Sequence, residues 1–216
     1  MANEITRLLP FRQYDENDVI NFYSYDKETG EAGSVVKIKS ANLTEEPVEY
    51  TTRGDSNAYL NTLGNGLSLY PTVPYKVEKM NNTGIGEQAL GILLRDVRAN
   101  DENGENLLYY PEKKEELQCV VSGEAVPIAT KGIFTINSKG LAGPAQGHAL
   151  GLPAVGSIAA PSLNGTITGF HDSTHAKHHY HVTHSIGQFI ATGLRESQGS
   201  TTDAFAGAYA ILKLDC

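Results

Sequence analysis

The alternation of apolar and polar residues between Gly123 and Leu214 forms short runs suited to β-strands, and each run ends at glycine, proline or asparagine. Runs of this length with turn residues between them are typical of an antiparallel sandwich or barrel. The predicted strands are Val126–Ile128, Gly132–Ile136, Val155–Ile158, Thr166–Phe170, Ile186–Thr192 and Ala208–Leu214. Because no run has the spacing of an amphipathic helix of three turns, we expect an all-β protein. It would have a β-barrel or β-sandwich body, an extended N-terminal arm and little helix.

Shorter strands are predicted in the first half of the chain, at Ser34–Ser40, Pro74–Met80 and Gly91–Arg98. The last of these is the most apolar, so we expect it to be a buried strand.

The strongest local signal for a hairpin is the dipeptide Asn103-Gly104, since a type I′ turn needs positive φ at both central residues. Such a turn would return Glu105–Tyr110 as the partner of the preceding strand. The charged run Pro111–Glu116 predicts a surface loop or a single helical turn.

The N-terminal stretch LLPFRQYDENDVINFY, residues 8–23, carries large apolar side chains without helical spacing. Pro10 disfavours a helical conformation for the residue before it. Two interpretations remain: an edge strand of its own domain, or an arm that lies on a neighbouring subunit. In the second, the partner-binding side chains are Leu8, Leu9, Phe11, Tyr14 and Phe22.

We expect residues 1–48 to form the arm and first strand, and residues 49–216 a β-rich body organised around 119–216. Deletion of Met1–Asn21 should then leave a folded body.

Composition and charge narrow the classes of function. The chain of 216 residues has 17 basic and 25 acidic residues, a net charge of −8. This balance argues against broad binding to nucleic acid or anionic membranes, which needs a basic face, so we expect neither as a partner, although a local basic patch is compatible with it. No run approaches the roughly 18 apolar residues needed to span a bilayer. The N-terminal residues also lack the apolar run of a signal peptide.

Histidine is concentrated in one segment. Six of the seven histidines lie in FHDSTHAKHHYHVTH, residues 170–184, and clustered imidazoles are common ligands of transition metals. The candidate ligands are His175, His178, His179 and His181. Their spacing matches no zinc motif, so three interpretations stay open: a solvated loop or subunit contact, a metal or anion site at an oligomer axis, or a pH-responsive contact. No other cofactor is expected.

The sequence gives little evidence for a catalytic nucleophile. Ser157 lies in V-G-S-I-A, which lacks the second glycine of a nucleophile elbow. Cys119 lies in a strand-like run and is expected to pack as a small apolar side chain, while the terminal Cys216 is expected to be exposed. We therefore expect no enzyme activity.

Three stretches resemble a known class of protein. They are LLPFRQYDENDVINFYSYD, the pair GILLRDVR and DENGE, and VVSGEAVPIATKGIFTI, which precedes the glycine-rich C-terminal region. Together they resemble virion structural proteins of tailed phages, most closely the small capsid decoration (cement) proteins of marine and cyanobacterial phages. Proteins of that class are β-rich, non-enzymatic and often trimeric on the outer capsid surface.

The resemblance implies a protein that cross-links adjacent capsomers of the shell. Its partners would be the major capsid protein and further copies of itself in a homotrimer, and it would reside in the virion after assembly in the host cytoplasm. Two alternatives stay open: another virion component such as a fibre, neck or tail protein, or a receptor- or glycan-binding β module that uses tyrosines as stacking platforms. The histidine-rich segment is not part of the resemblance.

Overall fold

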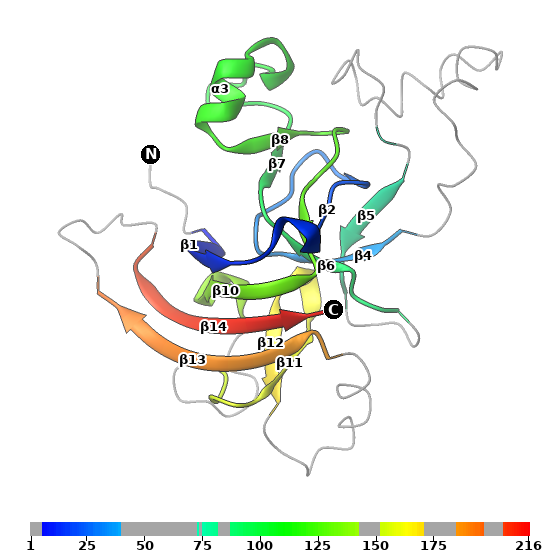
Figure 1. Ribbon diagram of the computed structural model, residues 1–216. Coiled ribbons are helices and arrows are strands. Elements are labelled where there is room, and N and C mark those ends of the chain that lie inside the picture. The colour runs from blue at the N-terminus through cyan, green and yellow to red at the C-terminus, as the bar shows by residue number, and fades with distance from the viewer. Residues whose placement is uncertain are drawn as a thin grey trace.

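The computed structural model describes residues 6–39, 73, 75–81, 87–142, 152–170, 185–196 and 205–216. Within these residues the chain forms three β-sheets, one short α-helix and four 3-10 turns (Figure 1). The predicted all-β class with little helix is confirmed.

The first sheet has six strands, all paired antiparallel. Its order is β1 (Leu8–Gln13), β10 (Lys131–Asn137), β14 (Gly207–Asp215), β13 (Gly187–Arg195), β11 (Ile158–Pro161) and β12 (Ile167–Phe170). An isolated bridge between Leu141 and Ile167 brings the end of β10 near β12, but the ladder does not close into a barrel.

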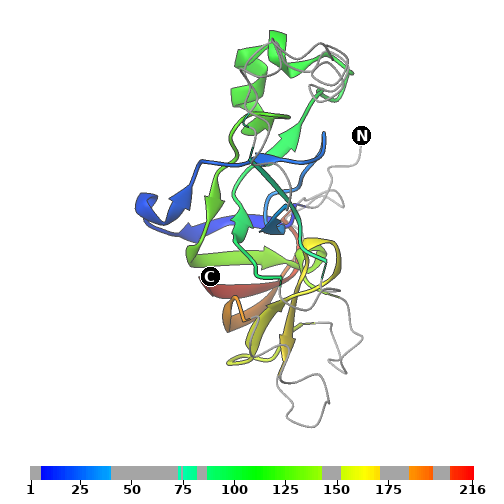
Figure 2. The same cartoon turned by 90° about the vertical axis from the view of Figure 1, so that its right-hand side faces the viewer.

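The second sheet also has six strands, built mostly from the first half of the chain. Its order is β2 (Val19–Ile20), β9 (Ile128–Ala129), β6 (Gly91–Leu93), β4 (Val35–Ile38), β5 (Lys76–Lys79) and β3 (Ser24–Tyr25). The third sheet pairs β7 (Asp96–Arg98) with β8 (Cys119–Val121) in parallel. The helical elements are η1 (Glu16–Asp18), η2 (Leu107–Tyr109), α3 (Pro111–Glu116), η3 (Ser138–Gly140) and η4 (Leu163–Gly165). Both views place α3, β7 and β8 at the opposite end of the molecule from β11 and β13 (Figure 2).

The second sheet contributes buried side chains to a core on each of its two faces, because successive side chains of a strand point to opposite faces. Val35 and Ile92 belong to a core shared with the first sheet, where they join Phe134 and Phe189. The next residues along the strands point the other way: Val36, Leu93 and Ile128 belong to a second core shared with Val97 and Val120. This packing of one sheet on another is a sandwich, so the sandwich alternative describes the body.

The N-terminal segment belongs to the body. β1 is the outer strand of the first sheet and β2 the outer strand of the second, and the side chains of Leu8 and Leu9 are only 7% and 6% exposed. This matches the edge-strand interpretation. Deletion of Met1–Asn21 would remove β1, β2 and the buried side chains of Leu8 and Leu9, so we expect it to destabilise the body. The proposed boundary at residue 48 lies outside the described residues.

The chain reverses after Gly91–Arg98 as predicted, but the pairing is short: Asn100 and Asn106 form an isolated antiparallel bridge, and the Leu107 N–H donates to the Ala99 carbonyl at 3.1 Å. The run Gly91–Arg98 is two short strands, β6 and β7, separated by a bend at Leu94 and Arg95, and they lie in different sheets. The predicted return strand over Glu105–Tyr110 does not form: this segment pairs only up to Asn106 and then enters the 3-10 turn η2. β7 pairs instead with β8.

The turn itself is not of type I′. Gly104 has a positive φ of 84° but Asn103 does not, and the Gly104 N–H donates to the Asp101 carbonyl at 3.2 Å. The Asp101 carboxylate accepts the N–H groups of Asn103 and Glu105 at 2.9 and 2.7 Å. An aspartate at the first position that bonds to the following backbone is typical of a type I turn.

No helix among the described residues is long and apolar enough to cross a membrane.

Candidate functional site

The predicted metal ligands His175, His178, His179 and His181 lie outside the described residues. Within the part of the chain that the structure describes, no group of three or more histidine, cysteine, aspartate or glutamate side chains is placed to hold a metal ion. The transition-metal hypothesis therefore stays a prediction.

The five predicted partner-binding residues divide into two sets. Leu8 and Leu9 are buried within this chain, so they are not available to a partner, and for them that prediction is corrected. Phe11, Tyr14 and Phe22 are 64%, 39% and 52% exposed. We refer to these three side chains as the N-terminal aromatic surface; they lie along the segment that forms the outer strands β1 and β2.

Two members of the N-terminal aromatic surface are held by stacking. The Tyr14 ring stacks on Phe134 with a centroid distance of 5.7 Å. Phe22 stacks on Tyr75 at 4.6 Å and meets the edge of Tyr23 at 5.2 Å. Aromatic pairs at these distances are attractive, so the exposed rings have defined positions.

The backbone between these aromatic residues is also fixed to the body. The Arg12 guanidinium donates to the Leu94 carbonyl at 3.3 Å. The Asp18 carbonyl accepts from both the backbone N–H and the hydroxyl of Thr130, at 2.9 and 3.0 Å. A surface held in this way loses little conformational entropy when a partner binds.

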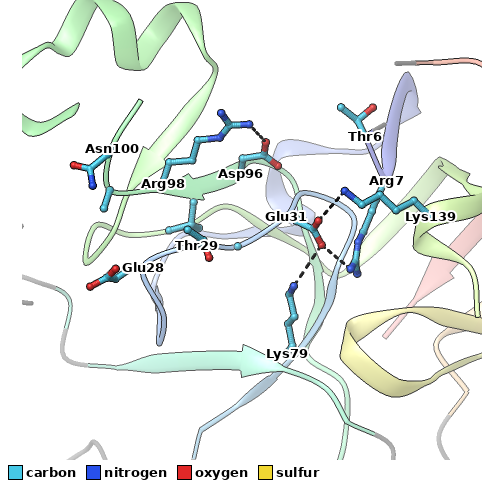
Figure 3. Close-up of a pocket in the computed structure, with 13 residues that line it drawn as sticks. Thr6, Arg7, Glu28, Thr29, Glu31, Lys79, Asp96, Arg98, Asn100 and Lys139 are labelled. Carbon is cyan, nitrogen blue, oxygen red and sulfur yellow. Dashed lines mark hydrogen bonds and ion pairs between the residues drawn. The ribbon is translucent and has the colours of Figure 1, made fainter. Parts of the chain in front are cut away.

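A second candidate site is an open pocket lined by charged residues (Figure 3). Its volume is about 550 Å³. At its centre is the Glu31 carboxylate, which accepts Arg7 Nη2 at 2.5 Å, Lys139 Nζ at 3.0 Å and Lys79 Nζ at 3.4 Å. We call Arg7, Glu31, Lys79 and Lys139 the Glu31 cluster.

Separate elements bring the Glu31 cluster together. Arg7 directly precedes β1, Glu31 lies in the turn before β4, Lys79 ends β5 and Lys139 lies in η3. Sequence analysis did not find this cluster, because no local spacing connects residues that meet only when the two sheets pack.

Arg7 is the most enclosed member, with 9% of its side chain exposed. Its Nη1 donates to Ser34 Oγ at 3.3 Å and to the Asn164 carbonyl at 3.1 Å, while its buried Nε has no partner among the described residues. Burial raises the pKa of Glu31, but the hydrogen bond from Lys139 and the charges of Arg7 and Lys79 outweigh it and lower this pKa below its usual value. Glu31 is therefore an anion surrounded by three cations.

The other described ionic residues of the pocket lining are Glu28, Asp96 and Arg98, whose charges nearly cancel. Arg98 Nη2 contacts Asp96 Oδ2 at 3.2 Å, and Asp96 Oδ1 also accepts the Ala32 N–H at 2.8 Å. Glu28 lies on the far side of the pocket from Lys139 (Figure 3).

The two thiols are poorly suited to nucleophilic chemistry. Burial raises the pKa of Cys119, and burial together with the Asp215 charge raises the pKa of Cys216 to about 12. A thiol with a raised pKa holds little thiolate at neutral pH. The expectation that Cys119 is buried is confirmed, whereas Cys216 is half-buried and packs against the first core rather than being exposed.

Comparison of the chain with protein-family models, with curated proteins and with solved structures finds no match.

Proposed function

We propose that the chain is a structural protein of a tailed-phage virion that binds the outer surface of the capsid and cross-links adjacent capsomers. Its partner would be the major capsid protein, it would act as a homotrimer and it would have no enzyme activity. The proposal rests on the sequence resemblance to decoration proteins and on one structural observation, the N-terminal aromatic surface.

The N-terminal aromatic surface supports a binding role because its side chains are of the type that anchors interfaces. Aromatic residues are enriched at the centres of protein interfaces, where a few side chains contribute most of the binding free energy. Phe11, Tyr14 and Phe22 are exposed in the isolated chain, yet Tyr14 and Phe22 are held by stacking. Repetition over a capsid lattice would multiply a modest contact through avidity.

The location of this surface supports the same role. Phe11 lies on β1, the outer strand of the first sheet, and Phe22 lies two residues after β2, the outer strand of the second, so one partner that covers both rings would engage both halves of the sandwich. The chain could bind a lattice through this surface without any change in its fold.

A second candidate, a glycan-binding module, is favoured by two adjacent tyrosines, one at the end of η2 and one directly after it. Tyr109 and Tyr110 are 61% and 47% exposed, and exposed tyrosine rings can stack on sugars. Binding to a glycan array that is lost in a Tyr109→Ala, Tyr110→Ala variant would support this candidate instead.

Co-sedimentation with shells of the same phage's major capsid protein tests the main proposal. We expect the wild-type chain to pellet with shells and the Phe11→Ala, Phe22→Ala variant to bind at least about tenfold more weakly, as for loss of interface anchors. Leu194→Ala is the control, because Leu194 is 69% exposed on β13. A wild-type chain that stays in the supernatant would refute the proposal, and equal loss in the control would refute the assigned surface.

A further inference from the structure

The Glu31 cluster contains more positive than negative charge. Three cationic side chains, Arg7, Lys79 and Lys139, contact a single carboxylate. Among the described residues of the lining the other ionic groups are Glu28, Asp96 and Arg98, and the last two pair with each other. The excess at the cluster stands out in a chain with a net charge of −8.

Glu31 does not use all the donors around it. An ammonium group has three N–H donors, and charge-assisted hydrogen bonds are usually about 2.7–2.9 Å long. Lys79 lies 3.4 Å from Glu31, and no other partner of Lys79 is found among the described residues. Its ammonium group therefore has donors that can turn to a second acceptor in the pocket.

The cluster is also partly enclosed, which strengthens its electrostatic interactions. The side chains of Lys79 and Lys139 are 27% and 31% exposed, so a ligand in the pocket can reach both. Arg7 is nearly buried and its Nε is unpartnered. It would act as a fixed positive charge behind the lysines, where screening by solvent is weaker than at an open surface.

We propose that this pocket is an oxyanion-binding site, in which Lys79 and Lys139 bind a carboxylate or phosphate group and Arg7 supplies supporting charge. The pocket of about 550 Å³ has room for a small organic acid or for one acidic group of a larger molecule. Glu31 neutralises part of the cluster when no ligand is bound and limits its affinity. The site does not depend on the proposed capsid function.

Isothermal titration calorimetry of the full chain with inorganic phosphate, and separately with succinate, at constant ionic strength tests the proposal. We expect binding by the wild-type chain and an affinity about tenfold lower in Lys79→Gln and in Lys139→Gln, because each loses one charge next to the ligand. Glu31→Gln should raise the affinity about tenfold, because it removes the competing carboxylate. The two titrations distinguish a phosphate ligand from a carboxylate ligand.

Lys131→Gln is the matched control, because Lys131 is exposed and pairs with Asp215 away from the pocket. Its affinity should equal that of the wild-type chain. Absence of binding to both anions, or equal weakening in Lys131→Gln and Lys79→Gln, would overturn the proposal. If Glu31→Gln fails to fold, the two lysine variants and the control still decide the outcome.

Discussion

At the scale of single residues, Glu31 links the pH dependence of stability to the packing of the two sheets. Its pKa is lower in the folded chain than its ordinary value of 4.5. The ionised carboxylate therefore stabilises the fold above that value, and this contribution is lost as the pH falls through the folded-state pKa.

We expect Glu31→Gln to lower the free energy of unfolding by about 1 kcal/mol at neutral pH, a modest value because the site is partly open to solvent. The difference from the wild type should shrink below pH 4.5. Urea unfolding at several pH values measures it, with the exposed Glu28→Gln as control. A difference that is constant across this range would contradict the role of ionised Glu31.

Gly104 and Gly187 both have positive φ but differ in the space around them. A Cβ at Gly104, where φ is 84°, would contact nothing within 4 Å, whereas at Gly187, where φ is 146°, it would lie 1.9 Å from the Lys213 carbonyl oxygen. We expect Gly104→Ala to cost about 1 kcal/mol from backbone strain alone, and Gly187→Ala at least about 3 kcal/mol.

Equilibrium unfolding compares the two alanine variants with Gly104→Asn, which should cost less because asparagine tolerates positive φ. Equal costs for Gly104→Ala and Gly187→Ala would mean that the close approach of β13 to β14 at Gly187 is not present.

The raised thiol pKa values give a chemical prediction. Cys119 and Cys216 hold little thiolate in the folded chain, so we expect both to react slowly with a disulfide reagent near pH 8 and quickly once urea unfolds the chain. Absorbance of the released thiolate measures the rates. Fast reaction of one thiol in the native protein would place that cysteine at the surface.

At the scale of elements, β1 contains both a core residue and an exposed aromatic residue. Leu8 lies in the first core at 7% exposure, while Phe11 on the same strand is 64% exposed. Leu8→Ala should lower the free energy of unfolding by about 2–4 kcal/mol, and Phe11→Ala by less than about 0.5 kcal/mol. Thermal or urea unfolding of the two variants checks this. A small effect of Leu8→Ala would restore the view that β1 is a separable arm.

The strands that could be predicted from the sequence are the long ones with local alternation. Ala208–Leu214 falls within β14 and Gly132–Ile136 within β10, and Ile186–Thr192 begins one residue before β13. Each of these runs alternates on a sheet with one face in the core. The strand predicted at Val155–Ile158 begins later in the structure. Gly156 has a positive φ and lies in a turn, and β11 begins at Ile158.

Other elements could not be predicted because distant pairing decides them. The apolar run Gly91–Arg98 looks like one strand, yet it bends at Leu94 and Arg95, where the pairing partners change: β6 pairs with β4 and β9, and β7 pairs with β8. The parallel pairing of β7 with β8 joins residues separated by η2 and α3. The Glu31 cluster depends on the same long-range packing, so its residues carry no signal in the sequence.

At the scale of the whole molecule, the N-terminal segment connects the fold to the proposed function. Leu8 packs in the first core and the Arg12 guanidinium donates to the Leu94 carbonyl, while Phe11, Tyr14 and Phe22 are exposed. The proposed binding surface is therefore held by the folded body, which would limit the entropy cost of binding a lattice.

Cryo-electron microscopy of phage capsid shells incubated with the purified chain tests the central claim most directly. We predict regular density on the outer surface of the shell, arranged as trimers, with β1 and β2 against the major capsid protein and the rings of Phe11 and Phe22 buried in the contact. Shells without added density, or density that contacts the shell through β11–β13 and leaves the N-terminal segment facing solvent, would contradict the account.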